Sequence, residues 1–394
     1  MTFFPEYVGP AAFGIKMGVI GPGTDLERLV VDAVIQCNHD ELLDNGDVIC
    51  ITESVLARSQ NNYVTLDEIA QEFRAKLNLT ESGKVGVIFP IASRNRFSMI
   101  MEAIAKAVPR GEVVVQLSWP TDEVGNEVIS EEFLAPLGKT LYDIITPAEL
   151  EGQDFSHPIT KVDYIKLYKE AIKAIGAKAT VFLANDARAI EGYNCDGIIV
   201  ADIHTRSKTK AAVDEISSNS MTLVDICSDE NQTVWSEWGL LGSNMSAAGK
   251  LKLAPRSASA FAELVQQRIM DRIQKRVEVI IYGDGAYKDP TTGIYELADP
   301  KPVFGATSGF SGAFREGVKY KYLADIGLTS GRNEHEIEEL LLQKQAESYE
   351  QNQVETEGTT PRKLEDVIAS LADLVSGSAD AGTPVIVVKG FFRQ

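Results

Sequence analysis

The sequence predicts an α/β protein of about two or three lobes, and three observations lead to that prediction. The chain has 394 residues, more than one hydrophobic core usually organises. Hydrophobic residues make up 44% and charged residues 24%, the balance of a folded globular chain. Short apolar runs alternate with amphipathic stretches through the middle of the chain, a pattern typical of parallel strands joined by helices.

The first 83 residues predict a turn, a helix and a strand. Residues 21–23 (GPG) form a turn, and Thr24 or Asp25 can cap the helix that follows. Apolar residues then recur at helical spacing over residues 26–34. Residues 48–52 (VICIT) follow a turn and form a short apolar run of the kind found in buried strands.

Residues 84–216 predict a separate α/β lobe. Four apolar runs in this region predict strands: VGVIFPI, EVVVQLS, ATVFLA and GIIVADI. Most of them precede an amphipathic stretch, such as residues 97–107. Such alternation predicts parallel strands with right-handed crossovers.

The rest of the chain predicts further helices and strands around one long connection. Residues 283–313 are rich in Gly, Pro, Asp and Thr, a length and composition often found in functional loops. The expected elements are helices at 257–274, 333–354 and 363–375, and strands at VEVIIY and VIVVKG.

The charge balance argues against two classes of partner. The chain has 38 basic and 57 acidic residues, a net charge of −19, which repels both nucleic acid and anionic lipid headgroups. The N-terminus lacks the pattern of a signal peptide, and no run is long enough to cross a bilayer. The four widely spaced cysteines predict reduced thiols. We therefore expect a cytoplasmic protein that binds neither nucleic acid nor membranes.

The glycine motifs of the sequence do not decide whether the chain binds a nucleotide or phosphate. Neither GxxxxGK[ST] nor a GxGxxG after a strand is present, so a bound nucleotide would be held by other means. Asp284, between Gly283 and Gly285, directly follows the strand VEVIIY and could hold a metal or approach a phosphate. An ordinary Asp-Gly turn explains the same residues. Asp122 and Glu123 likewise suit either a metal pair or a solvated turn.

Polar residues follow three of the predicted parallel strands. Ligands of open parallel sheets bind beyond the carboxyl ends of the strands, and Arg94 with Arg96 would suit an anion there. Ordinary strand-to-helix loops need polar caps as well, and this alternative explains the residues equally well. The residues are Ser93, Arg94, Arg96, Asn185, Asp186, Arg188, Asp202, His204 and Arg206.

Three stretches carry a family resemblance. The most specific is LEDVIASLADLVSGSADAGTPVIVVKG at residues 364–390. The second is GTDLERLV followed by GDVICITESVLARSQ, and the third is GSNMSAAGKLKLAPRSASAFAELVQQRI followed by KRVEVIIYGDG. Together they resemble the coenzyme F420-0:L-glutamate ligase family, whose members use GTP and a divalent metal to join glutamate to a carboxylate.

The resemblance implies a fold and a division into domains. It covers roughly residues 14–65 and 236–390, so both chain ends would form an α+β ligase-like scaffold. The parallel α/β lobe would then be an insertion. The expected parts are the N-terminal part of the ligase-like domain at 1–83, the inserted lobe at 84–216 and the C-terminal part at 217–394.

The resemblance also implies the site residues and cofactors. GTP or ATP would be the co-substrate, with Mg²⁺ or Mn²⁺ as the metal. The implied nucleotide-binding residues are Gly23, Thr24, Asp25, Arg58 and Ser59, and the implied metal ligands are Asp284, Glu365 and Asp366. No catalytic residue is assigned.

The sequence departs from the family pattern at two places that matter for the site. The family has Ser-Lys-Ala-Glu where this chain has residues 57–60 (ARSQ), so Arg58 keeps one positive charge. The family has an Asp shortly before Ser-Asn, where this chain has Leu241 before Ser243 and Asn244. One metal ligand is therefore missing, and Asp284 matches the other only with an insertion.

These observations predict a nucleotide- and metal-dependent amide ligase of the γ-glutamyl type. It would act on a small carboxylate through an acyl phosphate, take an amino acid as the amine and, by the resemblance, form a homodimer. One alternative is a catalytically inactive ligand-binding or regulatory protein on the same scaffold, as Leu241 suggests. Another is an enzyme whose chemistry lies in the inserted lobe, around Asp202 and His204.

Overall fold

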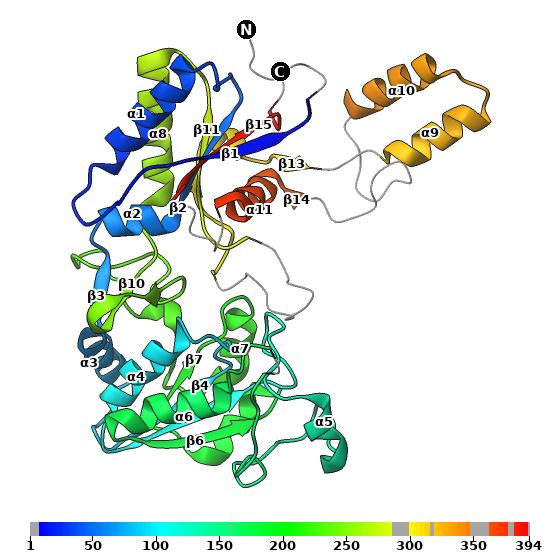
Figure 1. The fold of residues 1–394 in the computed structure, drawn as a ribbon. Helices are drawn as coiled ribbons and strands as arrows, with labels where there is room; N and C mark the ends of the chain where they lie inside the picture. Colours follow the sequence, from blue (N-terminus) through cyan, green and yellow to red (C-terminus); the bar gives the residue numbers. More distant parts are fainter. Residues whose placement is uncertain are drawn as a thin grey trace.

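The computed structural model describes residues 8–157, 159–285, 299–315, 319–346, 362–376 and 382–392. Over these residues the chain forms a mixed α/β structure with two main sheets (Figure 1). The predicted fold class is confirmed. No helix among the described residues is long and apolar enough to cross a membrane.

The first sheet joins the two ends of the chain. Its strands, in spatial order, are β1 (Ala11–Ile15), β15 (Val385–Lys389), β2 (Val48–Thr52), β11 (Glu278–Tyr282) and β12 (Val303–Ala306). β15 runs antiparallel to both β1 and β2, and β2 runs parallel to β11. The predicted strands VICIT, VEVIIY and VIVVKG are thus neighbours, with both of their faces covered, which explains their nearly unbroken apolar sequence.

Helices cover both faces of this sheet (Figure 1). On one face lie α1 (Leu26–His39) and α8 (Ala258–Ile273), and on the other lies α11 (Leu364–Ser376). α1 begins where the sequence predicts, because the Asp25 carboxylate accepts the backbone N–H of Arg28 at 3.1 Å. The short helix α2 (Glu53–Ser59) follows β2 directly.

The second sheet is entirely parallel, as the alternating pattern predicts. Its strands, in spatial order, are β6 (Lys178–Leu183), β5 (Glu112–Leu117), β4 (Lys84–Ile88), β7 (Gly197–Val200) and β8 (Ser220–Thr222). One face packs against α3 (Leu66–Lys76), α4 (Phe97–Ala107) and α6 (Tyr164–Ile175), and the other against α7 (Arg206–Asp214). The helix predicted at 97–107 is α4.

The strand order places a crevice beside β4. From β4 the chain moves to β5 and β6 on one side, and it later returns to β7 and β8 on the other side. The direction therefore reverses between β4 and β7, and ligands of such sheets bind beyond the carboxyl ends of the strands at this point. The loops after β4 and β7 carry Arg96 and His204.

Smaller elements complete the described chain. β3 (Tyr63–Thr65), β10 (Lys250–Lys252) and β9 (Asn244–Met245) form a three-stranded sheet, and β13 (Phe314–Arg315) pairs with β14 (Arg362–Lys363). α5 covers Glu131–Leu134. α9 (Tyr320–Thr329), which the sequence did not predict, forms a hairpin with α10 (Glu334–Ala346). α10 lies within the helix predicted at 333–354, of which residues 347–354 lie outside the described residues.

The predicted domain boundaries stay a prediction. α3 precedes residue 84, yet it packs against α4 in the core of the parallel sheet. β8 follows residue 216 and forms the edge of the same sheet.

Candidate functional site

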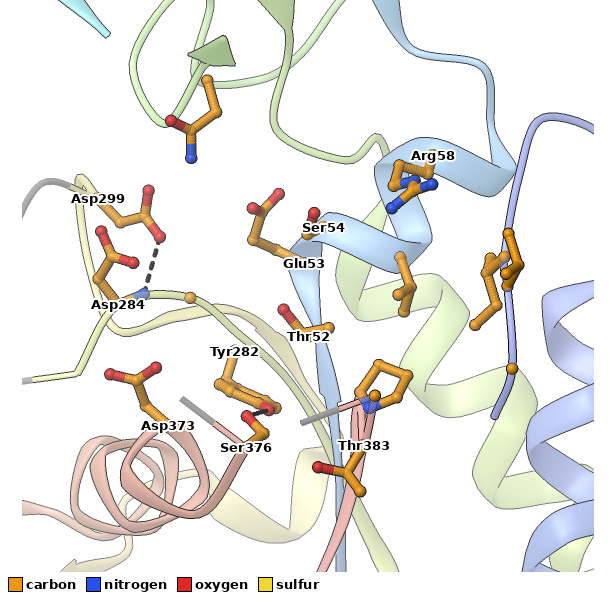
Figure 2. Close-up of a pocket in the computed structure, with 18 residues that line it drawn as sticks. Thr52, Glu53, Ser54, Arg58, Tyr282, Asp284, Asp299, Asp373, Ser376 and Thr383 are labelled. Atoms are coloured by element: carbon orange, nitrogen blue, oxygen red, sulfur yellow. Dashed lines mark hydrogen bonds between the residues drawn. The ribbon is translucent and has the colours of Figure 1, made fainter. Parts of the chain in front are cut away.

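A cavity of about 600 Å³ lies where the parallel strands β2 and β11 end. Thr52, the last residue of β2, and Tyr282, the last residue of β11, both line it (Figure 2). α11 adds residues from near the C-terminal end of the chain, among them Asp373. The volume is within the range of small-molecule sites, about 300–1,000 Å³.

Carboxylates gather on one side of this cavity. Figure 2 shows Asp284, Asp299 and Asp373 together on this side. The backbone N–H of Asp284 donates to Asp299 Oδ2 at 2.8 Å, and the N–H of Gly285 donates to Asp373 Oδ2 at 2.9 Å. Burial, together with the charge of Asp299, raises the pKa of Asp373 against the Gly285 hydrogen bond.

A guanidinium from the other sheet lies between two of these carboxylates. Arg96 Nη1 donates to Asp299 Oδ1 at 2.8 Å, and its Nη2 donates to Asp284 Oδ2 at 2.9 Å. Burial disfavours the charged guanidinium, but Asp299 and Asp284 outweigh this effect and raise the pKa of Arg96. Arg96 therefore stays charged, although its side chain is only 8% exposed.

Arg58 lines the opposite side of the cavity. It lies on α2, across from Asp284 in Figure 2, so a cation and the carboxylates face the same space. Gly23, in the turn before α1, donates its N–H to the Ser59 carbonyl at 3.0 Å, which holds this turn against α2. The cavity that Arg58 and Asp284 share thus combines residues from both ends of the chain.

Comparison with known families decides what kind of protein carries this cavity. A sequence model of the family F420-0:Gamma-glutamyl ligase matches residues 14–390. The chain belongs to this family. The match begins in β1 and ends directly after β15, and it confirms the resemblance drawn from the three stretches. A search of curated proteins found no match.

Membership of the F420-0:gamma-glutamyl ligase family implies a γ-glutamyl ligase activity. It also implies a nucleotide co-substrate and small-molecule substrates. A site for such an activity holds phosphate groups and a reacting carboxylate close together. In this member of the family, Arg58 is a cation that lines the cavity and can contact phosphate.

A second buried ion pair lies beside the cavity. Lys252 Nζ donates to both carboxylate oxygens of Glu53, at 2.6 and 2.7 Å, and both side chains are 7% exposed. Burial raises the pKa of Glu53, while Lys252 favours its charged form. This pair joins the first residue of α2 to β10, so it fixes the wall that carries Arg58.

The other predicted nucleotide-binding residues do not line the cavity. Asp25 caps α1, Thr24 Oγ1 accepts the N–H of Gly21, and Ser59 Oγ donates to the Leu56 carbonyl. These contacts give each of them a structural role beside the site. Their contact with a nucleotide, like that of Gly23, stays a prediction.

Two predicted metal ligands lie in another cavity. Glu365 and Asp366, at the start of α11, line a space of about 390 Å³ with Lys301 and Lys363. Burial raises the pKa of Asp366, and the two lysines oppose that effect. The structure therefore does not bring Glu365 and Asp366 together with Asp284 in one cavity.

The described carboxylates do not fit the metal that the family implies. Within residues 8–285, apart from 158, and the described segments that follow, no group of three or more His, Cys, Asp or Glu side chains is placed to hold a metal. Asp284 and Asp299 hold a guanidinium, and Leu241 is buried in an apolar cluster. Mg²⁺ takes oxygen ligands in near-octahedral geometry, and these residues do not provide that arrangement.

Of the polar residues predicted at the ends of the parallel strands, His204 lines a cavity beside the same carboxylates. This third cavity, of about 550 Å³, is lined by Glu123 and His204 on the side of the parallel sheet, and by Asp284 and Asp299 on the other. His204 Nε2 lies 3.0 Å from the Asp299 carbonyl oxygen. Asp202 is 1% exposed, and its Oδ2 accepts the hydroxyls of two threonines.

Asp122 and Glu123 fix loops. The Asp122 carboxylate accepts backbone N–H groups of Ala92, Val124 and Asn126. Glu123 accepts the N–H groups of residues 203–205. The turn interpretation explains these contacts, except that Asp122 is buried instead of solvated.

Sequence reasoning missed three carboxylates of the site. Glu53 directly follows the strand VICIT, so the end of that strand could have signalled it. Asp299 lies in the long connection that was predicted to be functional, but no local motif distinguishes it. Asp373 sits inside a helical pattern that predicts only an exposed face.

Proposed function

We propose that this protein is a nucleotide-dependent γ-glutamyl-type amide ligase that acts on a small carboxylate. GTP or ATP is the co-substrate, and an amino acid supplies the amine. The observation that carries this proposal is the shared cavity: Arg58 on one side and Asp284 on the other, in a chain that belongs to a ligase family.

The reaction consists of two displacements. A carboxylate oxygen of the substrate attacks the γ-phosphorus, the bond to the nucleoside diphosphate breaks, and an acyl phosphate forms. The amine nitrogen then attacks the acyl carbon, the bond to phosphate breaks, and an amide forms while the nitrogen loses a proton. Such chemistry depends mainly on positioning and on neutralising phosphate charge.

Different residues position the substrates and neutralise the phosphate charge. Arg58 presents a planar set of donors that suits phosphate oxygens. The Glu53–Lys252 pair positions α2, on which Arg58 lies. Mg²⁺ or Mn²⁺ is implied by the family alone, and no step here depends on a metal bound to the described carboxylates.

Phosphate release tests the proposal. The protein is incubated with GTP or ATP, a panel of small carboxylates and a panel of amino acids, and released phosphate is measured. Release that requires both the carboxylate and the amine supports a ligase. Arg58→Ala should abolish it, whereas Arg94→Gln, at an exposed arginine that does not line the cavity, should not.

A second candidate is a ligand-binding or regulatory protein on the same scaffold. The observation that favours it is Leu241, which is 1% exposed in an apolar core where the family pattern has a carboxylate. This candidate predicts nucleotide binding without phosphate release in any mixture. Binding of GTP or ATP in calorimetry, without phosphate release in any mixture, would favour the binding protein over the ligase.

The remaining parts of the proposal have separate tests. Chemistry centred on Asp202 and His204 predicts that His204→Ala loses activity while nucleotide binding is kept. A homodimer, which the family resemblance suggests, would show twice the mass of 43.0 kDa in light scattering.

A further inference from the structure

Arg96 reaches the carboxylates of the site from the parallel sheet. It lies in the loop after β4, at the N-cap position of α4, where the strand order reverses. The side chain leaves its own lobe and ends between Asp284 and Asp299, which belong to the segments that follow β11 and precede β12. A residue of one lobe thus forms ion pairs with two carboxylates of the other.

The surroundings hold this guanidinium in place. Asp299 is 3% exposed, and it uses Oδ1 for Arg96 and Oδ2 for the N–H of Asp284. The loop is also fixed on the other side, because the Met245 N–H donates to the Asn95 carbonyl at 2.9 Å. Nearby, His204 Nε2 lies against the Asp299 carbonyl. Contacts therefore fix both the guanidinium of Arg96 and the loop that carries it.

The surrounding charges fit this arrangement. Two neighbouring carboxylates in a partly buried place need a positive charge, because an uncompensated buried charge is strongly unfavourable. A divalent cation supplies that charge when several oxygen ligands surround it. Here Leu241 stands in the sequence where the family pattern has an aspartate, and a guanidinium contacts Asp284 and Asp299.

We propose that Arg96 is the resident cation of the Asp284–Asp299 pair and takes the place of a divalent metal there. This proposal rests on the proposed ligase site. Its test measures metal binding alone, so the result can be interpreted even if the protein has no ligase activity. A guanidinium tethered to the chain cannot be removed by a chelator, and it excludes a second cation from the same oxygens.

Binding of Mn²⁺ to the full chain without nucleotide tests this inference. Free Mn²⁺ is followed by electron paramagnetic resonance during titration. The wild type should show no Mn²⁺ site that depends on Asp284, so Asp284→Asn should leave its titration unchanged. Arg96→Gln should gain one Mn²⁺ site, at least about tenfold tighter than any site of the wild type, since a fixed positive charge is removed.

Three further variants make the result specific. Arg96→Gln combined with Asp284→Asn should lose the gained site. Arg96→Lys keeps the charge and should bind no Mn²⁺ at the pair. Arg94→Gln changes the net charge equally at an exposed position two residues away, and it should match the wild type.

Several outcomes would overturn the inference. One is a wild-type Mn²⁺ site that Asp284→Asn abolishes. Another is a folded Arg96→Gln protein that gains no site, or an equal gain in Arg94→Gln. If Arg96→Gln does not fold, as circular dichroism would show, the comparison of the wild type with Asp284→Asn decides alone.

Discussion

At the scale of single residues, the site depends on buried charges that are paired. Glu53 with Lys252, and Arg96 with Asp284 and Asp299, place opposite charges within hydrogen-bond distance around the cavity. Pairs of this kind add little net stability, but losing one partner leaves a buried charge uncompensated. Here these ion pairs fix the positions of the segments that surround the cavity.

The Glu53–Lys252 pair gives the first prediction. Lys252→Met should lower the free energy of unfolding by about 3–5 kcal/mol, because Glu53 stays buried without its partner. Chemical denaturation measures this change, and the double variant with Glu53→Gln should recover much of it. Arg268→Met is the matched control. Its side chain is 54% exposed in a pair with Glu27, so the loss should stay below about 1 kcal/mol. Equal losses in both would contradict the prediction.

Glu149 gives a prediction about pH. Its hydrogen bonds, first from Lys139 and then from Thr146, lower the pKa of Glu149 from 4.5 to about 2. A lowered carboxyl pKa stabilises the fold above the unfolded value, and this stability is lost as pH falls toward 2. The side chain is 30% exposed, so the effect should stay below about 1 kcal/mol.

Urea denaturation over a pH series measures this contribution. Lys139→Met removes the strongest cause of the lowered pKa. The stability difference between the wild type and this variant should be complete at pH 6 and should shrink as pH falls from 4.5 toward 2. A difference that stays constant over this range would assign the effect of Lys139 to packing.

Single residues also show where sequence reasoning ends. Arg58 and Asp284 were predicted site residues, and they line one cavity because β2 and β11 are adjacent parallel strands. Arg96 was considered as an anion contact, since it follows a strand. Its actual partner Asp284 lies 188 residues away, and no local pattern encodes that pairing.

At the scale of elements, strands with strong apolar patterns were the most predictable. VICIT, VEVIIY and VIVVKG are β2, β11 and β15, and residues 97–107 are α4. Helix α9 was missed because its pattern is weak: only Leu323 and Gly327 in it are buried. An element that packs chiefly against one neighbouring helix needs no long apolar stripe.

The turn before β2 gives a prediction about how the chain ends meet. Gly46 has a φ of +81°, and a Cβ there would lie 2.3 Å from the Phe392 carbonyl oxygen. Gly46→Ala should therefore lower the free energy of unfolding by more than about 2 kcal/mol. Gly23→Ala is the matched control. Its φ is +77°, but its Cβ would meet nothing within 4 Å, so only a backbone cost of about 1 kcal/mol is expected. Thermal unfolding of both proteins compares them, and similar losses would show that the contact with Phe392 is unimportant.

At the scale of the whole molecule, two sheets contribute to one site. The first sheet supplies the cavity, and the loops at the switch point of the second sheet supply Arg96 and His204. The parallel second sheet could be predicted from the apolar runs, and the joining of both chain ends in one scaffold from the resemblance. Strands β1 and β12 and the mixed order of the first sheet were not predicted. The contact through Arg96 could not be predicted, because its partners Asp284 and Asp299 lie 188 and 203 residues away in the sequence.

A ligand that spans this cavity should stabilise the entire chain. GTP or ATP at about 100 times its dissociation constant should raise the free energy of unfolding by about 2.7 kcal/mol, because it binds only the folded state. Differential scanning fluorimetry follows the rise in melting temperature. Arg58→Ala should lose most of it at the same concentration, and an equal rise in this variant would remove Arg58 from the nucleotide site.

The position of β15 has a consequence for how the chain folds during synthesis. β15 lies between β1 and β2, and its residues leave the ribosome several hundred positions after those of β2. At a synthesis rate of about 5–20 residues per second, tens of seconds pass between the synthesis of β2 and that of β15, the strand that pairs with both β1 and β2. The strands of the parallel sheet all emerge within residues 84–222, so that sheet can close first. Nascent chains should therefore hold a folded lobe beside two unpaired strand edges until synthesis reaches residue 389, and such edges are prone to pair with other chains.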